Sequence, residues 1–237
     1  MREKNYLLVL LTYIGMLLST VLIPLALVNF YDFDLLTTSI YANIVAFIIG
    51  AIIIWQLLKD NLRKEREDHP LPLKDFVIWT ISGVFLAYAG QMFGNLIEMQ
   101  LLGIKPGSEN TELIVKLTQM NFLFLLLPAI LGPLIEELVF RKVIFGSLRR
   151  RMNIHVAATI SALIFAFFHL DFDHLLIYFV MGLVFTFLYV KTNRIIVPIV
   201  VHMIMNTLAV IVQSLIDPEE LERMLEEVSM ILLGGWF

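Results

Sequence analysis

Residues 131–142 read LGPLIEELVFRK and place two adjacent carboxylates, Glu136 and Glu137, and an arginine, Arg141, inside an otherwise apolar segment. In a bilayer a charged side chain costs about 3 kcal/mol on insertion scales, so such residues are interpreted as functional and as having a partner. Glu137 and Arg141 are four residues apart and share one face of a helix, which predicts an ion pair. Glu136 is turned about 100° from Glu137. It has no cation on its own face, and we expect its partner on another helix.

The composition is that of an integral membrane protein. Of 237 residues, 59% are hydrophobic and only 16% are charged, and the mean hydropathy is +0.85. A soluble domain has about 25% charged residues. The chain has no cysteine, which excludes disulfides, thiolate nucleophiles and cysteine-based metal or iron–sulfur sites. The net charge of −4 is mixed in sign and no basic block is present, so no nucleic-acid partner is expected. We expect one membrane domain, residues 1–237, in a lipid bilayer.

Long apolar runs predict an all-α fold, a polytopic transmembrane bundle of about seven to eight helices. The expected spans are residues 6–31, 35–58, 76–97, 117–149, 153–170, 175–190 and 195–216. In the fourth span, Pro128, Gly132 and Pro133 predict a kink just before the glutamates.

The segments between and after the spans carry their own signals. Residues 59–75 (KDNLRKEREDHPLPLKD) are expected to form a loop with a solvated charged face, and residues 103–111 a Gly/Pro turn. In the third span, the glycines at 83, 90 and 94 favour close approach by a neighbouring helix. Residues 217–237 begin Asp-Pro-Glu-Glu and then place apolar residues on one face, which predicts an amphipathic tail helix. This tail fits either an interfacial helix or a short eighth span.

Lysine and arginine are distributed unevenly between the two sides of the predicted spans. Of the 17 such residues, thirteen fall on the side of the N-terminus, three on the other side, and Arg141 within the membrane. An excess of Lys and Arg marks the cytoplasmic side. We therefore expect a cytoplasmic N-terminus in a bacterial plasma membrane. Removing one span would exchange the sides of all later loops and abolish the asymmetry. The asymmetry therefore also supports seven spans.

Further polar side chains interrupt the late spans. His169 lies at the end of the fifth span, and His202 and Asn206 share one face near the middle of the seventh. Singly, each is explained by an interhelical hydrogen bond. Burying all of them together with Glu136 costs too much without a common role, and we expect them to line one site. His174, in the turn after His169, is expected to make a structural hydrogen bond or to contact solvent.

One carboxylate, two imidazoles and one carboxamide suit peptide-bond hydrolysis. Glu136 can act as a general base toward water, with one histidine orienting that water. The other histidine and the Asn206 amide can donate hydrogen bonds to the oxyanion, each worth about 3 kcal/mol of barrier. The same set offers zinc two imidazoles and a carboxylate, from Glu136, His169 and His202. Asparagine is a poor zinc ligand, so a metal-free site without a cofactor is favoured and zinc is kept as the alternative.

Three spaced motifs occur in order on the late spans: EExxxR at 136–141, FxxxH at 165–169 and HxxxN at 202–206. With them the chain resembles the CPBP family of intramembrane proteases, which comprises CAAX proteases and bacteriocin-processing (Abi) enzymes. The motifs lie within residues 131–210, and the family-like catalytic core is about 117–216. The resemblance implies an endopeptidase whose catalytic residues are Glu136, His169, His202 and Asn206, supported by Glu137 and Arg141. For this family both a metalloendopeptidase and a metal-free glutamate mechanism are proposed.

Other functions stay open on the sequence alone. Glutamate and histidine within spans also serve proton relays in transporters or channels, but those folds have repeated broken helices and this chain has one. A catalytically idle peptide-binding or immunity protein is a further alternative. The HExxH, GxGD and GxSx motifs of other intramembrane proteases are absent. The expected partner is a peptide or membrane-anchored protein substrate, and CAAX-type prenyl peptides, bacteriocin or pheromone precursors and membrane-protein tails all fit.

Overall fold

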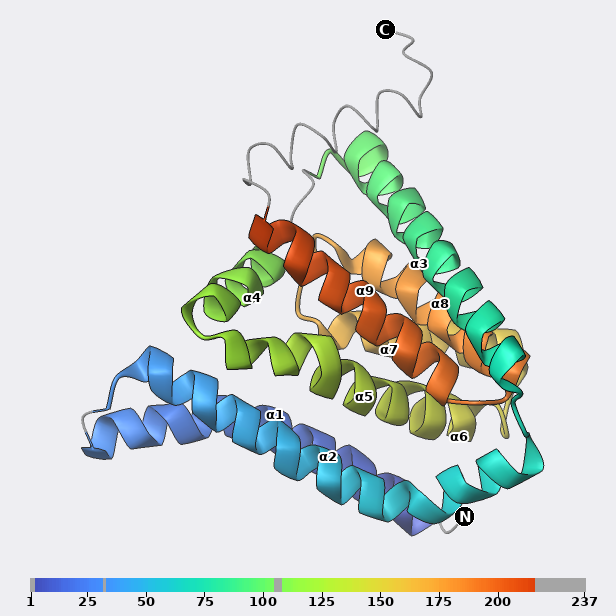
Figure 1. The fold of residues 1–237 in the computed structure, drawn as a ribbon, viewed down its shortest axis with the longest axis horizontal. Coiled ribbons are helices and arrows are strands. Elements are labelled where there is room, and N and C mark those ends of the chain that lie inside the picture. Colours follow the sequence, from blue (N-terminus) through green and yellow to red (C-terminus); the bar gives the residue numbers. More distant parts are fainter. Residues whose placement is uncertain (1–2, 32, 105–107, 216–237) are drawn as a thin grey trace, which may run out of the picture.

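The structure, a computed structural model, describes residues 3–31, 33–104 and 108–215. All regular secondary structure in these ranges is helical, which confirms the expected all-α bundle (Figure 1). The elements are, in order, α1 (Glu3–Tyr31), α2 (Leu35–Asp68), α3 (Leu73–Leu102), α4 (Glu109–Met120), η1 (Phe122–Leu125), η2 (Leu127–Leu131), α5 (Gly132–Glu136), η3 (Glu137–Phe145), α6 (Gly146–Leu148), α7 (Ile154–Phe168), α8 (Leu175–Thr192) and α9 (Ile196–Leu215). The tail expected at 217–237 lies outside the described residues.

α1 and α2 form an antiparallel hairpin along one side of the molecule (Figure 1). Asp34 starts α2 by accepting a hydrogen bond from the Thr37 N–H at 2.8 Å, and this bond holds the pKa of the Asp34 carboxyl below its usual value. The hairpin is close at Gly50, where a Cβ would lie 2.6 Å from the Met16 sulfur. A side chain at this position would therefore require the Met16 side chain to move.

The charged segment 59–75 is mostly helical, so the loop expected there is wrong. α2 continues through it to Asp68, and a short turn at 69–72 leads into α3. The reason is Glu65, which is only 8% exposed and accepts hydrogen bonds from the Tyr189 hydroxyl at 3.1 Å and the Ile195 N–H at 2.8 Å. Lys142 also pairs with Glu65. These contacts bind the end of α2 to the second half of the chain.

α3 packs against α8 and α9 through its glycines, as expected. A Cβ on Gly83 would lie 2.8 Å from Cγ2 of Val201, and one on Gly94 would lie 3.3 Å from the Cα of Ile177. Gly103 ends α3 with φ of 66°, a left-handed conformation that glycine adopts without strain.

The span expected at 117–149 is divided. α4 ends at Met120, and Asn121, in an extended conformation, begins a second helical run that ends at Leu148. Within this run η2 and η3 are π-helical, and α5 lies between them. The prolines at 128 and 133 have no N–H to donate, so the α-helical ladder is interrupted just before the glutamates. π-helical turns occur frequently at functional sites.

Six helical segments of the described residues are long and apolar enough to cross a membrane, namely α1, α2, α3, the run 122–148, α8 and α9, whereas α7, in the place of the fifth expected span, is shorter. Its 15 residues extend for about 22 Å, less than the roughly 30 Å of a hydrocarbon core. α7 ends at Phe168, and Leu170 follows with a left-handed φ of 55°. The chain turns there and returns through α8.

The bundle has two main apolar cores, and α9 contributes to both. One core joins α1, α2, α5, η3 and α7, and Ile199 of α9 belongs to it. The other joins α3, α8 and α9 and contains Val201. Because Ile199 and Val201 lie in different cores, α9 runs between them, and Figure 1 shows it in the centre of the bundle. Many large apolar side chains, Phe30, Phe85 and Phe122 among them, are exposed, as in a surface that faces lipid.

Candidate active site

Glu137 and Arg141 form the predicted ion pair at the buried centre of the molecule. Arg141 Nη1 lies 3.0 Å from Glu137 Oε1, and the two side chains are 1% and 0% exposed. Arg141 also donates to the Gly182 carbonyl at 3.3 Å, and its guanidinium lies 4.1 Å from the centre of the Phe165 ring. Cation–π contact with a desolvated guanidinium is favourable. Arg141 therefore fixes η3 against both α7 and α8.

His202 of α9 connects the two glutamates. Its Nδ1 lies 3.0 Å from Glu137 Oε1, and its Nε2 lies 3.8 Å from Glu136 Oε2. An ionised carboxylate can only accept a hydrogen bond, so Nδ1 carries the proton and Nε2 of the neutral ring presents a lone pair. The ring is also stacked on Phe185, with centroids 4.5 Å apart and planes at 21°. Glu137, interpreted from the sequence only as the partner of Arg141, thus also orients His202.

Glu136 lies opposite His202 of α9, with Oε2 3.8 Å from Nε2. Its side chain is 22% exposed, but Oε2 is enclosed and has no hydrogen-bond partner among the described residues. The other carboxylate oxygen lies near Gly132, one turn earlier, where a Cβ would be 3.6 Å from Oε1 and 3.0 Å from the Leu127 carbonyl oxygen. The interrupted helix therefore brings bare backbone next to this carboxylate.

Asn206 lies one turn after His202 on α9 and contacts η2, the π-helical turn before the glutamates. Its Nδ2 donates a hydrogen bond to the Pro128 carbonyl at 3.0 Å. This bond fixes the plane of the amide and uses one of its two N–H groups. The second N–H is left to donate to another group.

His169 follows the last residue of α7. Its Nδ1 lies 2.8 Å from the Phe165 carbonyl oxygen, an acceptor, so this ring also keeps its proton on Nδ1. The ring lies between Phe165, at 4.5 Å, and Tyr178, which stacks on it at 4.0 Å and 25°. Phe165 in turn lies 6.1 Å from His202, and both Glu136 and His202 interact electrostatically with His169. Phe165 thus forms a wall between the two imidazoles.

A zinc ion at this site would be held by Glu136, His169 and His202. A catalytic zinc site has three protein ligands that converge on one point. In the described part of the chain, no three His, Asp or Glu side chains do so. Glu136, His169 and His202, as placed, therefore do not form a metal site.

Three residues of the early helices approach the late ones and were not predicted from the sequence. The Tyr13 ring packs on Phe140 and Phe168, each at 5.7 Å, and interacts electrostatically with Glu136. Glu65 holds η3 and the start of α9, as described above. Glu98 is 1% exposed in α3, which extends past residue 97, the expected end of the third span. A lone acid within an apolar helix would have been the signal for Glu98.

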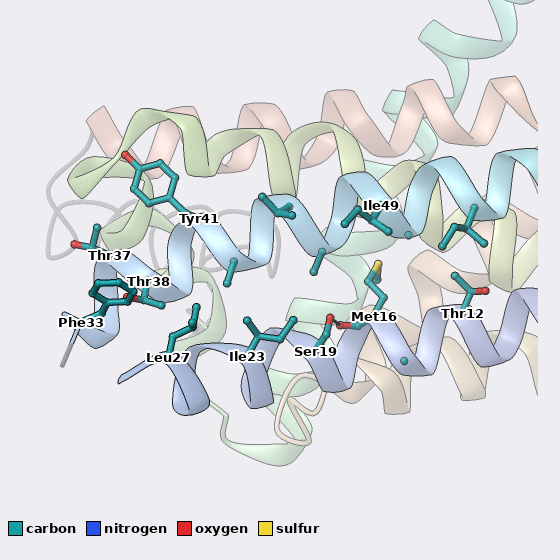
Figure 2. Close-up of a pocket in the computed structure, with 16 residues that line it drawn as sticks. Thr12, Met16, Ser19, Ile23, Leu27, Phe33, Thr37, Thr38, Tyr41 and Ile49 are labelled. Atoms are coloured by element: carbon teal, nitrogen blue, oxygen red, sulfur yellow. Dashed lines mark hydrogen bonds between the residues drawn. The ribbon is translucent and has the colours of Figure 1, made fainter. Parts of the chain in front are cut away.

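A cavity of about 760 Å³ lies elsewhere, between α1 and α2 (Figure 2). Its lining is mostly apolar, with hydroxyl groups from Thr12, Ser19, Thr37 and Thr38. No acid or imidazole lines it. The glutamates and histidines described above lie on other elements, Glu136 in α5, Glu137 in η3, His169 after α7 and His202 in α9.

The chain is thus a polytopic helical membrane protein with a buried cluster of carboxylates and imidazoles. A family described as type II CAAX prenyl endopeptidase Rce1-like matches residues 118–208. The chain is 36% identical over 191 residues to the putative membrane peptidase YdiL of Bacillus subtilis (strain 168), covering 76% of this chain and 77% of that protein. It is 36% identical over 166 residues to the membrane-embedded CAAX protease MroQ of Staphylococcus aureus (strain USA300), covering 67% of each. No solved structure matches. The chain belongs to the CPBP family of intramembrane proteases.

Proposed function

We propose that this chain is an intramembrane endopeptidase in which Glu136 activates a water molecule for attack on a peptide carbonyl. One observation carries the proposal. Glu136 Oε2 is enclosed, has no hydrogen-bond partner among the described residues and lies 3.8 Å from His202 Nε2. Leaving a buried carboxylate oxygen unpaired is costly, and such groups concentrate at catalytic sites.

In the proposed reaction, water lies between Glu136 and His202. The water transfers one proton to Glu136 as its oxygen bonds to the scissile carbonyl carbon, while Nε2 of His202 accepts a hydrogen bond from the other O–H, which stays on the water oxygen. The hydrogen bond from Nδ1 of His202 to Glu137 keeps that lone pair available. The tetrahedral intermediate then breaks its C–N bond, and Glu136 gives the proton to the leaving nitrogen. The products are one carboxylic acid and one amine.

The negative oxygen of the intermediate needs donors. The free N–H of the Asn206 amide supplies one, and its bond to Pro128 holds it in place. That donor is worth about 3 kcal/mol of barrier. His169 keeps its proton on Nδ1, bonded to the Phe165 carbonyl, so Nε2 of its neutral ring accepts a hydrogen bond from the substrate. We propose that no metal ion takes part, and a zinc-dependent form of the same protease is the alternative.

We further propose that the substrate is a membrane-anchored peptide of the CAAX type. The support is that MroQ is named a CAAX protease and that the matching family is described as a CAAX prenyl endopeptidase. Glu136, His202 and Asn206 also lie on helical segments long and apolar enough to span a bilayer, so a membrane-anchored substrate can reach them from the membrane. The proposed location is a bacterial plasma membrane with the N-terminus in the cytoplasm.

The test uses purified protein in lipid nanodiscs and an internally quenched peptide that ends in a Cys-aliphatic-aliphatic-X sequence, with and without an S-farnesyl group. We expect the wild type to cleave the farnesylated peptide and Glu136→Gln to leave it intact, with cleavage sites read by mass spectrometry. Equal cleavage of both peptides would overturn the prenyl requirement. Cleavage by Glu136→Gln at the wild-type rate would overturn the role of Glu136 as the base.

A further inference from the structure

A second buried carboxylate lies at the opposite end of α8 from Glu65. Glu98 of α3 is 1% exposed, and its Oε2 lies 2.9 Å from Nδ1 of His174, the residue before α8. Its other oxygen accepts a hydrogen bond from the Ile177 N–H at 3.2 Å. The first N–H groups of a helix have no partner within the helix, and an anion there is stabilised by the helix dipole. Glu98 thus caps α8 from another helix.

A glycine makes this contact possible. Gly94 lies one turn before Glu98 on α3, and a Cβ there would be only 3.3 Å from the Ile177 Cα and 3.7 Å from its nitrogen. α3 therefore approaches the backbone of α8 directly at the place where Glu98 accepts the Ile177 N–H. The glycines of α3 were expected to favour close helix approach, and at Gly94 this approach places the Glu98 carboxylate next to the start of α8.

The cap leads directly to His169. Tyr178 is the next residue after Ile177, its N–H donates to the His174 carbonyl at 3.3 Å, and its ring stacks on His169 at 4.0 Å and 25°. Stacked rings contribute about 1 kcal/mol beyond the area they bury. Glu98 therefore holds two residues that contact Tyr178. His174 accepts the Tyr178 N–H, and Ile177 precedes Tyr178 in the chain. The ring of Tyr178 in turn stacks on His169.

We propose that Glu98 is a positioning residue for His169 and acts through the start of α8 and the ring of Tyr178. The consequence for catalysis rests on the role proposed for His169 above. Glu98 lies outside residues 118–208, which the family match covers, so an early helix sets the geometry of a late catalytic group. Glu98 touches none of the reacting atoms. Its effect is to hold the imidazole in one orientation, with its proton on Nδ1 and the lone pair on Nε2.

The test compares Glu98→Ala and Tyr178→Leu with the conservative variants Glu98→Gln and Tyr178→Phe, all as full-length protein in nanodiscs. The first readout is the rate at which diethyl pyrocarbonate acylates His169, followed by mass spectrometry, with His202 as the internal reference. Loss of the stack should raise the rate at His169 about fivefold and leave His202 unchanged. The second readout is cleavage of the farnesylated peptide. There kcat should fall about tenfold with KM unchanged.

The conservative variants should restore both readouts, since Gln keeps an acceptor for the Ile177 N–H and Phe keeps the ring. Gly90→Ala is the matched packing control, because its Cβ would press on Val180 Cγ1 at 3.0 Å in the same helix interface. If Glu98→Ala and Tyr178→Leu change neither readout, or only as much as Gly90→Ala, the proposal is wrong. If Glu98→Ala does not fold, the two readouts of Tyr178→Leu test the proposal. If His169→Ala still cleaves the peptide, the catalytic role proposed for His169 is wrong. The acylation rates would still test separately whether Glu98 positions the His169 ring.

Discussion

Nδ1 of His202 lies 3.0 Å from Oε1 of Glu137, the same oxygen that Nη1 of Arg141 approaches at 3.0 Å. One buried carboxylate therefore neutralises the arginine and fixes the tautomer of the imidazole. Only with its proton on Nδ1 does the neutral ring turn a lone pair toward Glu136. The two adjacent glutamates thus have different surroundings, because successive residues on a helix point about 100° apart.

The first prediction concerns Glu136. Glu136→Gln should lower kcat about a thousandfold, because an amide cannot take a proton from water. The melting temperature should stay the same or rise, since Oε2 has no hydrogen-bond partner to lose among the described residues. Peptide cleavage and a thermal melt in nanodiscs measure the two effects. Glu112→Gln, at an exposed carboxylate in α4, is the control and should change neither.

The second prediction concerns the Glu137–Arg141 pair. Glu137→Ala and Arg141→Ala should each lower the free energy of unfolding by about 3–5 kcal/mol, because each leaves a buried charge unpaired. The double variant should lose less than the sum of the two. Arg63→Ala is the control, because Arg63 and Glu67 form an exposed ion pair with the same i,i+4 spacing at 3.9 Å. It should lower the free energy of unfolding by at most about 1 kcal/mol. Equal losses at the buried and exposed pairs would contradict the assignment.

Much of the site was predictable from Glu136, Glu137 and Arg141, because a charge in an apolar run has few explanations. The helical repeat also placed His202 and Asn206 on one face. Glu65 was missed for a physical reason: it lies in a run of charges that is typical of a solvated segment, and its partner Lys142 is 77 residues away. Pairing over such a distance depends on how helices pack, and no local pattern encodes it. The break at Asn121 was missed because the apolar character continues through it.

The third prediction concerns metal dependence. Cleavage should survive exhaustive chelation with EDTA and 1,10-phenanthroline, and elemental analysis of the active protein should find no stoichiometric zinc. The reason is that Glu136, His169 and His202 do not converge in the described part of the chain as three zinc ligands would. Loss of activity on chelation, restored by added zinc in a one-to-one ratio, would establish the metalloenzyme alternative.

The last prediction concerns Gly132, whose missing side chain leaves room beside the base. A Cβ there would lie 3.0 Å from the Leu127 carbonyl oxygen and 3.6 Å from Glu136 Oε1. The first distance is shorter than ordinary contact, so Gly132→Ala must shift the backbone of the interrupted helix and with it the carboxylate. We expect kcat to fall about a hundredfold, since small misplacements of reacting groups have effects of this size.

Gly15→Ala is the matched control for this variant. A Cβ at Gly15 meets no atom within 4 Å, and alanine is favoured over glycine within a helix by about 1 kcal/mol. Gly15→Ala should therefore keep full activity and melt at the same or a higher temperature. If Gly132→Ala cleaves the peptide as fast as Gly15→Ala does, the close approach of backbone to Glu136 has no catalytic role. A loss of activity in Gly132→Ala with an unchanged melting temperature would place the effect on the position of the carboxylate rather than on folding.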